Sequence, residues 1–338
     1  MKKGRILTGH RPTGRRHMGH WLGTLENWRR LQDDYECFFL IADLHVLTTS
    51  FAQTEVVRGN IVETVRDWLA AGIDPLRSTF VLQSAVPEHA ELQLLLSMLV
   101  TVERLERNPT YKEQKKELHL GKSASLGLLS YPVLQAADIL VYRADTVPVG
   151  EDQLPHIELT REIARRFNHL YGETFPEAQA LLSPTARIPG VDGRMMHTSY
   201  SNSIPLSASE EEVRQKVLSM VTDPLKARAD DPGRPEVCSA FALLKAFDGL
   251  IPVRGPFTVE TVAADCRAGA IGCVADKNRF ADVYIKALLP FRTVREKVPP
   301  EVVWEILGSG THKAREVARE TLDMVRERMH FTHARLPI

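Results

Sequence analysis

Two histidines, His17 and His20, follow a glycine-rich stretch near the start of the chain. Residues 8–14 are Thr-Gly-His-Arg-Pro-Thr-Gly, and the histidines come three residues later in His-Met-Gly-His. Glycines let the backbone approach a nucleotide closely, and the first turn of a helix attracts phosphate. The pattern differs from a dinucleotide-binding G-x-G-x-x-G loop and from a Walker loop. Taken alone, it fits a phosphate-binding turn and a glycine–proline turn with surface histidines equally well.

Asp138 lies in an otherwise mainly apolar segment, Tyr131-Pro-Val-Leu-Gln135-Ala-Ala-Asp138-Ile-Leu140. A buried carboxylate is costly unless it is paired. It can accept a hydrogen bond from a group that only donates, such as an indole N–H. From these residues alone, an aspartate that faces water on a helix is the alternative.

The first half of the chain has the pattern of alternating strands and helices that would position such residues. Short apolar runs predict strands at 5–8, 37–42, 79–82 and 147–149, and helical periodicity predicts helices at 54–71, 90–107, 125–138 and 152–167. This order predicts an α/β fold with a doubly wound parallel sheet, whose ligand sits at the carboxyl ends of the strands. A Pro-, Gly- and Ser-rich loop is expected at 183–203, followed by mainly helical chain and a last helix at 312–328.

Composition limits the class of protein. The 338 residues are 43% hydrophobic, which allows a large core, and 43 Lys plus Arg balance 43 Asp plus Glu. Any RNA contact must therefore use a local basic patch. There is no signal-peptide core and no apolar stretch long enough for a bilayer, so we expect a cytoplasmic protein with no membrane partner. Four cysteines do not suggest a disulfide framework.

Several blocks, in the same order along the chain, resemble the tryptophanyl branch of the class I aminoacyl-tRNA synthetases. His17-Met-Gly-His20 resembles the family's "HIGH" motif, and Gly9-x-x-Pro-Thr-Gly14 before it matches the tryptophanyl branch. Four further blocks resemble family segments: Ile41–Thr48, Gln83–His89, Arg107–Glu113 and Gly150–Gln153. The fold implied by the resemblance is a Rossmann-type catalytic domain with a helical anticodon-binding domain.

The resemblance implies a tryptophan–tRNA ligase. Such an enzyme activates L-tryptophan with ATP, accompanied by Mg2+, to tryptophanyl-adenylate and transfers it to tRNA(Trp). By the same resemblance His17, His20 and Lys112 are the expected catalytic residues, acting on the phosphates of ATP. The expected ATP contacts are Arg11, Thr13, Gly19, His20, Gly150, Asp152, Arg194, Met196 and Ser199. The expected tryptophan contacts are Asp138, Tyr131, Gln135, His45 and Gln153.

The choice of amino acid has a competitor. The pattern Tyr131-x-x-x-Gln135-x-x-Asp138 also occurs in tyrosyl-tRNA synthetases, where it binds a phenol, so a tyrosine–tRNA ligase is one alternative. The neighbouring Ala-Ala-Asp-Ile-Leu, the Arg-Asn-Pro-Thr-Tyr-Lys block and Gly150-Glu-Asp-Gln153 look tryptophanyl instead.

The family's second ATP motif, "KMSKS", is degraded. The aligned residues are Met195-Met196-His197-Thr198-Ser199, so Met195 and Thr198 stand where relatives carry lysines. Those lysines compensate charge on the triphosphate. Arg194, or His197 when protonated, is a possible substitute cation. The second alternative is therefore a synthetase paralogue that binds tryptophan as a regulator and aminoacylates weakly or not at all.

Three cysteines and an aspartate, Cys238, Cys266, Cys273 and Asp276, resemble an iron–sulfur site of some family members, in which a fourth cysteine stands at the position of Asp276. Three thiolates and a carboxylate can hold an iron–sulfur cluster or zinc. The alternative is a set of unliganded, partly buried thiols.

The expected organisation is a catalytic domain at 1–190, a helical anticodon-binding domain at 191–290 and C-terminal helices at 291–338 that pack back on the core. The resemblance also implies a homodimer, with each tRNA crossing the interface.

Overall fold

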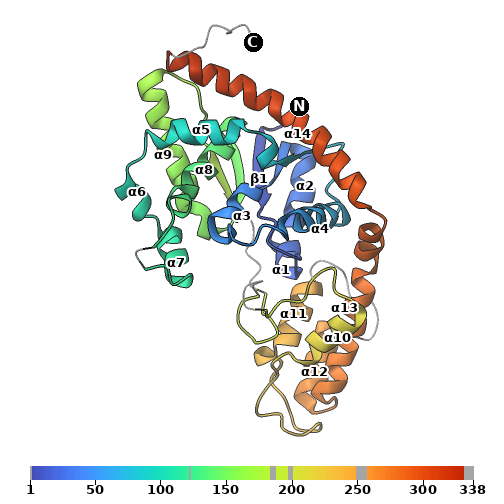
Figure 1. Cartoon of the computed structure of the whole chain (residues 1–338). Helices are drawn as coiled ribbons and strands as arrows, with labels where there is room; N and C mark the ends of the chain where they lie inside the picture. Colours follow the sequence, from blue (N-terminus) through green and yellow to red (C-terminus); the bar gives the residue numbers. More distant parts are fainter. Residues whose placement is uncertain (1, 122, 183–187, 197–200, 249–256, 331–338) are drawn as a thin grey trace.

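The computed structural model describes residues 2–121, 123–182, 188–196, 201–248 and 257–330. The chain forms a part with a central sheet and a part built of helices (Figure 1). The last helix runs along the outside of the sheet-containing part.

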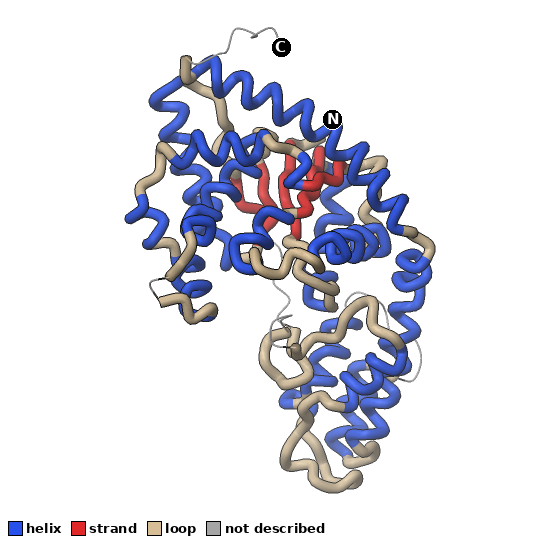
Figure 2. Tube along the Cα trace, viewed as in Figure 1, coloured by secondary structure: helices blue, strands red, loops and turns tan. Residues whose placement is uncertain are grey.

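The sheet has five parallel strands in the order β3-β2-β1-β4-β5 (Figure 2). Their bounds are β1 (Arg5–His10), β2 (Glu36–Ile41), β3 (Thr79–Leu82), β4 (Thr146–Val149) and β5 (Gln179–Leu182). The chain builds outward from β1 to β3 and then crosses to the other side of β1 for β4. The predicted doubly wound parallel sheet is confirmed, and its switch point lies between β1 and β4.

Both faces of the sheet are covered, as the continuous apolar run of β2 predicts. Cys37, Phe39 and Ile41 point to one face, whereas Phe38 and Leu40 point to the other. The first face packs on η1 (Trp21–Leu25, a π-helix), α2 (Glu26–Asp34) and α4 (Val57–Ala70). The second face packs on α5 (Glu88–Ser97), α8 (Leu126–Val141) and α9 (Leu154–Tyr171).

Short helices link these elements. They are α1 (Met18–His20), α3 (Asp43–Ser50), η2 (Gln83–Ala85), α6 (Val102–Glu106), α7 (Pro109–Glu117) and η3 (Glu151–Gln153). The single helix predicted at 90–107 is in fact α5 and α6. The Thr101 side chain accepts a hydrogen bond from the Arg104 N–H and so starts a new helix there.

The helical part contains α10 (Glu210–Leu218), η5 (Pro235–Val237), α11 (Ser239–Asp248), α12 (Val259–Ala268) and α13 (Cys273–Glu296). The expected boundary at 290 falls inside α13, which continues through Pro290 to Glu296.

The last helix, α14 (Pro300–Arg328), is longer than the predicted 312–328. It begins with Pro300, a residue suited to the first turn because its missing N–H has no partner there anyway. α14 lies on β3: a Cβ on Gly310 would be 2.1 Å from the Phe80 carbonyl oxygen. The Leu82 N–H also donates to the Thr311 hydroxyl at 3.0 Å. This contact fixes α14 against the edge strand.

Among the described helices, none combines the length and the apolar character needed to cross a membrane.

Candidate active site

A cavity of about 350 Å³ opens at the carboxyl ends of β1, β2 and β4. Its lining includes Gly9 and His10 from β1, Ala42 after β2 and Val149 from β4. This is the switch point at which open α/β sheets bind ligands. The predicted ligand-binding residues that line it are Arg11, His45, Tyr131, Gln135, Asp138, Gly150 and Gln153.

Asp138 is the buried charge of this cavity, 2% exposed. Its carboxylate accepts hydrogen bonds from His45 Nε2 at 2.8 Å and from His89 Nδ1 at 2.6 Å. Gln83 Nε2 lies 2.8 Å from one carboxylate oxygen and 3.0 Å from the other. Burial pushes the pKa of Asp138 upward, but the hydrogen bonds from His45 and His89 outweigh it, and the pKa of the carboxyl lies below its ordinary value. Asp138 is therefore ionised at neutral pH.

Tyr131, on the same helix, belongs to a second buried polar chain. Its hydroxyl lies 3.2 Å from His156 Nε2, and His156 Nδ1 lies 3.2 Å from Asn108 Nδ2. The Asn108 amide donates, so a neutral His156 carries its proton on Nε2 and donates it to Tyr131. Burial lowers the pKa of His156 to about 4, which keeps the ring neutral. Asn108 also caps α7, and so it connects that helix to the cavity.

Arg11 places a cation in the cavity wall. One terminal nitrogen donates to the Thr49 hydroxyl at 2.5 Å, while its buried Nε has no hydrogen-bond partner among the described residues. Burial lowers the pKa of the guanidinium, because the charged form is poorly solvated. Unused donors on a desolvated cation suit an anionic ligand such as a carboxylate or phosphate.

The two signature histidines stand side by side at the start of α1. Their ring centroids are 4.0 Å apart. His17 Nδ1 accepts from the Gly19 N–H at 3.2 Å, and His20 Nδ1 accepts from the His17 N–H at 3.3 Å. Each neutral ring therefore carries its proton on Nε2, where it can donate a hydrogen bond to a phosphate oxygen. A Cβ on Gly19 would be 3.0 Å from the His17 ring, so this glycine allows the ring to fold over the helix start.

His10, which has no predicted role, supports this pair from the end of β1. Its Nδ1 accepts from the Trp68 indole at 3.1 Å, and its Nε2 faces the Thr24 hydroxyl at 3.2 Å. Burial, the largest cause, places the pKa of His10 well below its ordinary value. The His10 and His20 ring centroids are 5.6 Å apart, so His10 joins the cavity to the signature helix.

None of His17, Gly19 and His20 lines the cavity, and three further predicted residues also lie outside its wall. The side chains of Thr13, Lys112 and Asp152 are exposed, and none of them lines the cavity. Lys112 stands on α7, however, whose Thr110 and Gln114 do line it.

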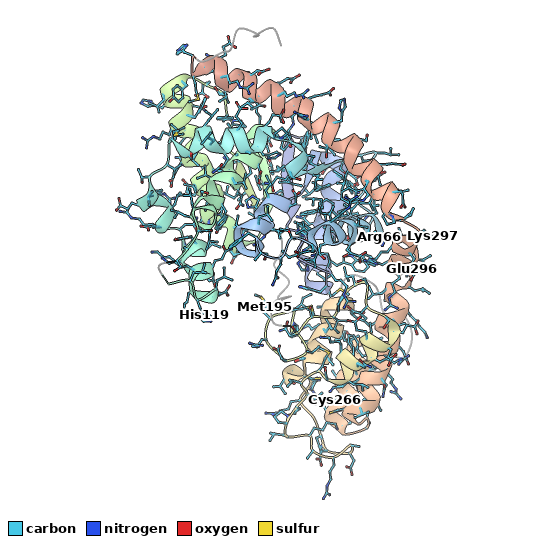
Figure 3. All side chains as sticks on the ribbon, in the orientation of Figure 1. Arg66, His119, Met195, Cys266, Glu296 and Lys297 are labelled. Atoms are coloured by element: carbon cyan, nitrogen blue, oxygen red, sulfur yellow. The ribbon has the colours of Figure 1, made fainter. Side chains whose placement is uncertain are left out.

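The degraded loop is described up to Met196, so Ser199 lies outside the described residues. Arg194 is paired with Asp192 at 2.7 Å, and its side chain is 64% exposed. Met196 is buried in the hydrophobic core, whereas Met195 is 58% exposed and lies at the junction of the two parts (Figure 3). The described part of the loop thus presents Arg194 as its cation, held by Asp192.

The cysteine set lies in the helical part, where Figure 3 labels Cys266. Cys238, Cys266, Cys273 and Asp276 line one cavity, but its volume is only about 20 Å³, room for a single water. In the part of the chain that the structure describes, no three His, Cys, Asp or Glu residues are placed to hold a metal ion. Burial raises the pKa of Asp276 to about 6 and raises the pKa of the Cys238 and Cys266 thiols. The described residues therefore give no support for an iron–sulfur cluster or zinc at this site.

Sequence comparison agrees with the fold and the cavity. The profile of the tRNA synthetases class I (W and Y) matches residues 1–289. The tryptophan–tRNA ligase of Thermotoga maritima is 49% identical, over 97% of this chain and 99% of the relative. That of Aquifex aeolicus is 41% identical, over 97% and 100%.

Structure comparison gives the same relatives. The crystal structure of tryptophanyl-tRNA synthetase from Campylobacter jejuni with ADP and tryptophan superposes with a TM-score of 0.87 at 32% identity. The match covers 96% of this chain and 99% of that one. A parallel sheet with a cavity at its switch point, next to a histidine pair at a helix start, defines a class I synthetase catalytic part. The chain belongs to the tryptophanyl and tyrosyl family of class I tRNA synthetases. The resemblance stated from the sequence motifs is confirmed.

Proposed function

We propose that this chain is a tryptophan–tRNA ligase, which activates L-tryptophan with ATP and transfers it to tRNA(Trp). The observation that carries the proposal is the ionised Asp138 in the cavity wall, held by three side-chain donors. An indole N–H can only donate, and an ionised buried carboxylate is a strong acceptor for it. Phenylalanine would leave this acceptor without the ligand's hydrogen bond and so be rejected.

The remaining residues suggest how ATP is used. In activation, a carboxylate oxygen of tryptophan attacks the α-phosphorus of ATP, and the bond to the bridging oxygen of pyrophosphate breaks. Arg11 would hold the amino-acid carboxylate or the α-phosphate. His17 and His20 would stabilise charge on the phosphates, with Lys112 and Arg194 as further cations. Mg2+ bound to ATP would neutralise part of the triphosphate charge.

The proposal extends to a homodimer. Exposed apolar side chains gather along α5 and the start of α6: Leu94 is 55%, Met98 68% and Val102 60% exposed. Apolar residues exposed so close together are typical of a protein–protein contact. Sedimentation should give twice the chain mass, and a charged residue at Met98 should shift the mass toward that of one chain. Binding of tRNA(Trp) across that dimer, and the cytoplasmic location, stay predictions.

A second function is favoured by one observation only. Met195 is uncharged at a position where the family carries lysine, and it is 58% exposed. A paralogue that binds tryptophan without activating it would have such a loop.

Tryptophan-dependent exchange of labelled pyrophosphate into ATP tests the proposal directly. We expect exchange with L-tryptophan and much less with L-tyrosine. Exchange that depends on tyrosine alone would support the tyrosine–tRNA ligase. Tryptophan binding without any exchange would support the regulatory paralogue.

A further inference from the structure

His89 lies behind Asp138, on the side away from the ligand cavity. Its side chain is fully buried, with 0% exposed, and it is not part of the cavity wall. Its Nδ1 lies 2.6 Å from Asp138 Oδ1, and its Nε2 lies 2.7 Å from the Tyr142 hydroxyl. Tyr142, also 0% exposed, is stacked on Phe38 of β2 with ring centroids 4.7 Å apart.

The hydrogen bonds that join Tyr142, His89 and Asp138 have one consistent set of donors and acceptors. Burial, with the negative charge of Asp138 added, raises the pKa of Tyr142 well above its ordinary value, so the hydroxyl keeps its proton. Tyr142 therefore donates to His89 Nε2. A neutral imidazole that accepts on Nε2 carries its proton on Nδ1, which faces the carboxylate. Tyr142 thus selects the His89 tautomer that donates to Asp138.

Contacts of the first turn of α5 hold His89 in place. Glu88, the preceding residue, is 7% exposed. Its carboxylate forms ion pairs with Arg315 at 3.1 Å and with Arg319 at 3.2 Å, both from α14. The His89 N–H also donates to the Val86 carbonyl at 3.2 Å. Because these contacts tie the first turn of α5 to α14, His89 has little freedom to move away from Asp138.

Gln83 is the second donor that stands behind the carboxylate. Its Oε1 accepts from the Leu44 N–H at 3.1 Å, which turns its amide nitrogen toward Asp138. A carboxylate accepts about four hydrogen bonds. His89 and Gln83 occupy Oδ1, and His45 together with the longer branch from Gln83 reaches Oδ2. Oδ2 is the oxygen bonded to the cavity-lining His45, and its contact from Gln83 is the longer branch, so an indole N–H from the cavity would take the place of that branch on Oδ2.

We infer that His89, backed by Tyr142, is a positioning residue for amino-acid specificity: it keeps Asp138 ionised and turns Oδ2 toward the indole N–H. This inference rests on the proposed function, since it needs tryptophan in the cavity. His89 touches no substrate and acts only through Asp138. His45, by contrast, lines the cavity and can touch the ligand directly.

The test compares two amides at position 89. Asparagine places its amide nitrogen where His Nδ1 lies, so His89→Asn keeps the donor to Asp138. Glutamine places its amide where Nε2 lies, so His89→Gln keeps the contact with Tyr142 and loses that donor. The binding of L-tryptophan is compared with that of L-3-benzothienylalanine, in which sulfur replaces the indole N–H. Wild type should prefer tryptophan roughly tenfold or more, the ratio expected for a hydrogen bond to a charged group.

We expect His89→Asn to retain most of this preference and His89→Gln to lose most of it, while both bind the analogue about as well as wild type. Gln32→Leu is the matched control. It removes another buried side chain with four hydrogen bonds, on α2 and outside the cavity wall, so it should lower the melting temperature and leave the preference unchanged. Tyr142→Phe removes the hydroxyl that donates to His89 and should reduce the preference for tryptophan less than His89→Gln does.

Equal preferences in the Asn and Gln variants, or a full preference in Tyr142→Phe, would overturn the inference and leave the proposed function standing. A wild-type protein with no preference for tryptophan over the analogue would instead contradict the reading of Asp138, and this inference with it.

Discussion

Arg295, in the last turn of α13, donates from Nε to the buried carboxylate of Asp67 on α4 over 2.8 Å. The other Asp67 oxygen accepts from the Arg16 N–H at 3.3 Å, one residue before His17. A second Arg295 nitrogen bonds Glu63, also on α4. This set of contacts connects the helical part of the chain to the loop that carries the signature histidines. α13 is thereby connected, through Asp67, to the residue that precedes His17.

Removal of Arg295 should be costly for stability. Asp67 is 0% exposed, and Arg295→Met would remove the ion pair that its carboxylate makes. We expect a loss of about 3–5 kcal/mol in the free energy of unfolding, as for other broken buried ion pairs. Arg214→Met is the control, because the Arg214–Asp282 pair is exposed and should contribute less than about 1 kcal/mol. Urea unfolding measures both. Similar losses in the two variants would show that the buried pair is not the link described here.

The charge of Asp138 should decide tryptophan affinity. Asp138→Asn keeps the shape but replaces one acceptor oxygen by a donor, so we expect a loss of about 1–3 kcal/mol in the binding of L-tryptophan. Calorimetry with L-tryptophan and L-tyrosine measures the effect. Tighter binding of tyrosine than of tryptophan by the wild-type protein would sink the assignment of the amino acid.

The signature histidines should affect the reaction more than the binding. His17→Ala and His20→Ala each remove a group placed where phosphate charge develops. We expect each to lower pyrophosphate exchange about a hundredfold. The dissociation constant for tryptophan should change little. An equal fall in affinity and rate would indicate instead that the His17–His20 pair mainly supports the fold of α1.

Much of the fold follows from local patterns in the sequence. The apolar runs at β2 and β3 predict strands, and β3 has the predicted bounds, Thr79–Leu82. The strand β5, Gln179–Leu182, was not predicted, because four half-exposed residues carry no clear period. The break between α5 and α6 was also missed, since the apolar pattern continues through Leu99 and Val100 to the cap at Thr101.

The residues that line the cavity were easier to predict from the sequence than the residues that hold them. The motif residues Arg11, Tyr131 and Asp138 gather in the cavity as expected. The partners that set their protonation were missed: His89 and His156 are single histidines in partly apolar helices, a pattern equally typical of a satisfied core residue. Whether Cys238, Cys266, Cys273 and Asp276 leave room for a metal was not predictable either. Their spacing in the sequence does not report how much space the folded side chains leave.

Acid should destabilise the protein through His156. Burial lowers its pKa from the ordinary 6.5 to about 4, so between these pH values the unfolded chain binds the proton and the folded one does not. The stability is complete above pH 6.5 and is lost as the pH falls toward 4, by up to about 3 kcal/mol. His156→Gln cannot titrate and should show a flatter profile of unfolding free energy between pH 7 and 4.5. Parallel profiles for wild type and variant would exclude His156 as a source of acid sensitivity.

The degraded loop allows a test by gain of function. Relatives grip the triphosphate with two lysines where this chain has Met195 and Thr198, and Thr198 lies outside the described residues. Met195 is 58% exposed, so a lysine there would meet no packing restriction. Arg194, the neighbouring cation, is paired with Asp192 at 2.7 Å and is thereby drawn toward a carboxylate. If the enzyme works with a weakened clamp, restored lysines should stabilise the charge that builds up as pyrophosphate leaves.

We therefore expect Met195→Lys together with Thr198→Lys to raise the rate of tryptophan activation, with a gain of about 1–3 kcal/mol in the barrier. Affinity for L-tryptophan should hardly change, because Met195 does not line the amino-acid cavity. Met195→Gln with Thr198→Gln is the control, since it restores length and polarity without charge and should give no gain. Exchange of pyrophosphate could stay undetectable in the wild type and in the lysine variant while tryptophan is still bound. That result would overturn the proposal that the protein is an enzyme and would favour the tryptophan-binding paralogue.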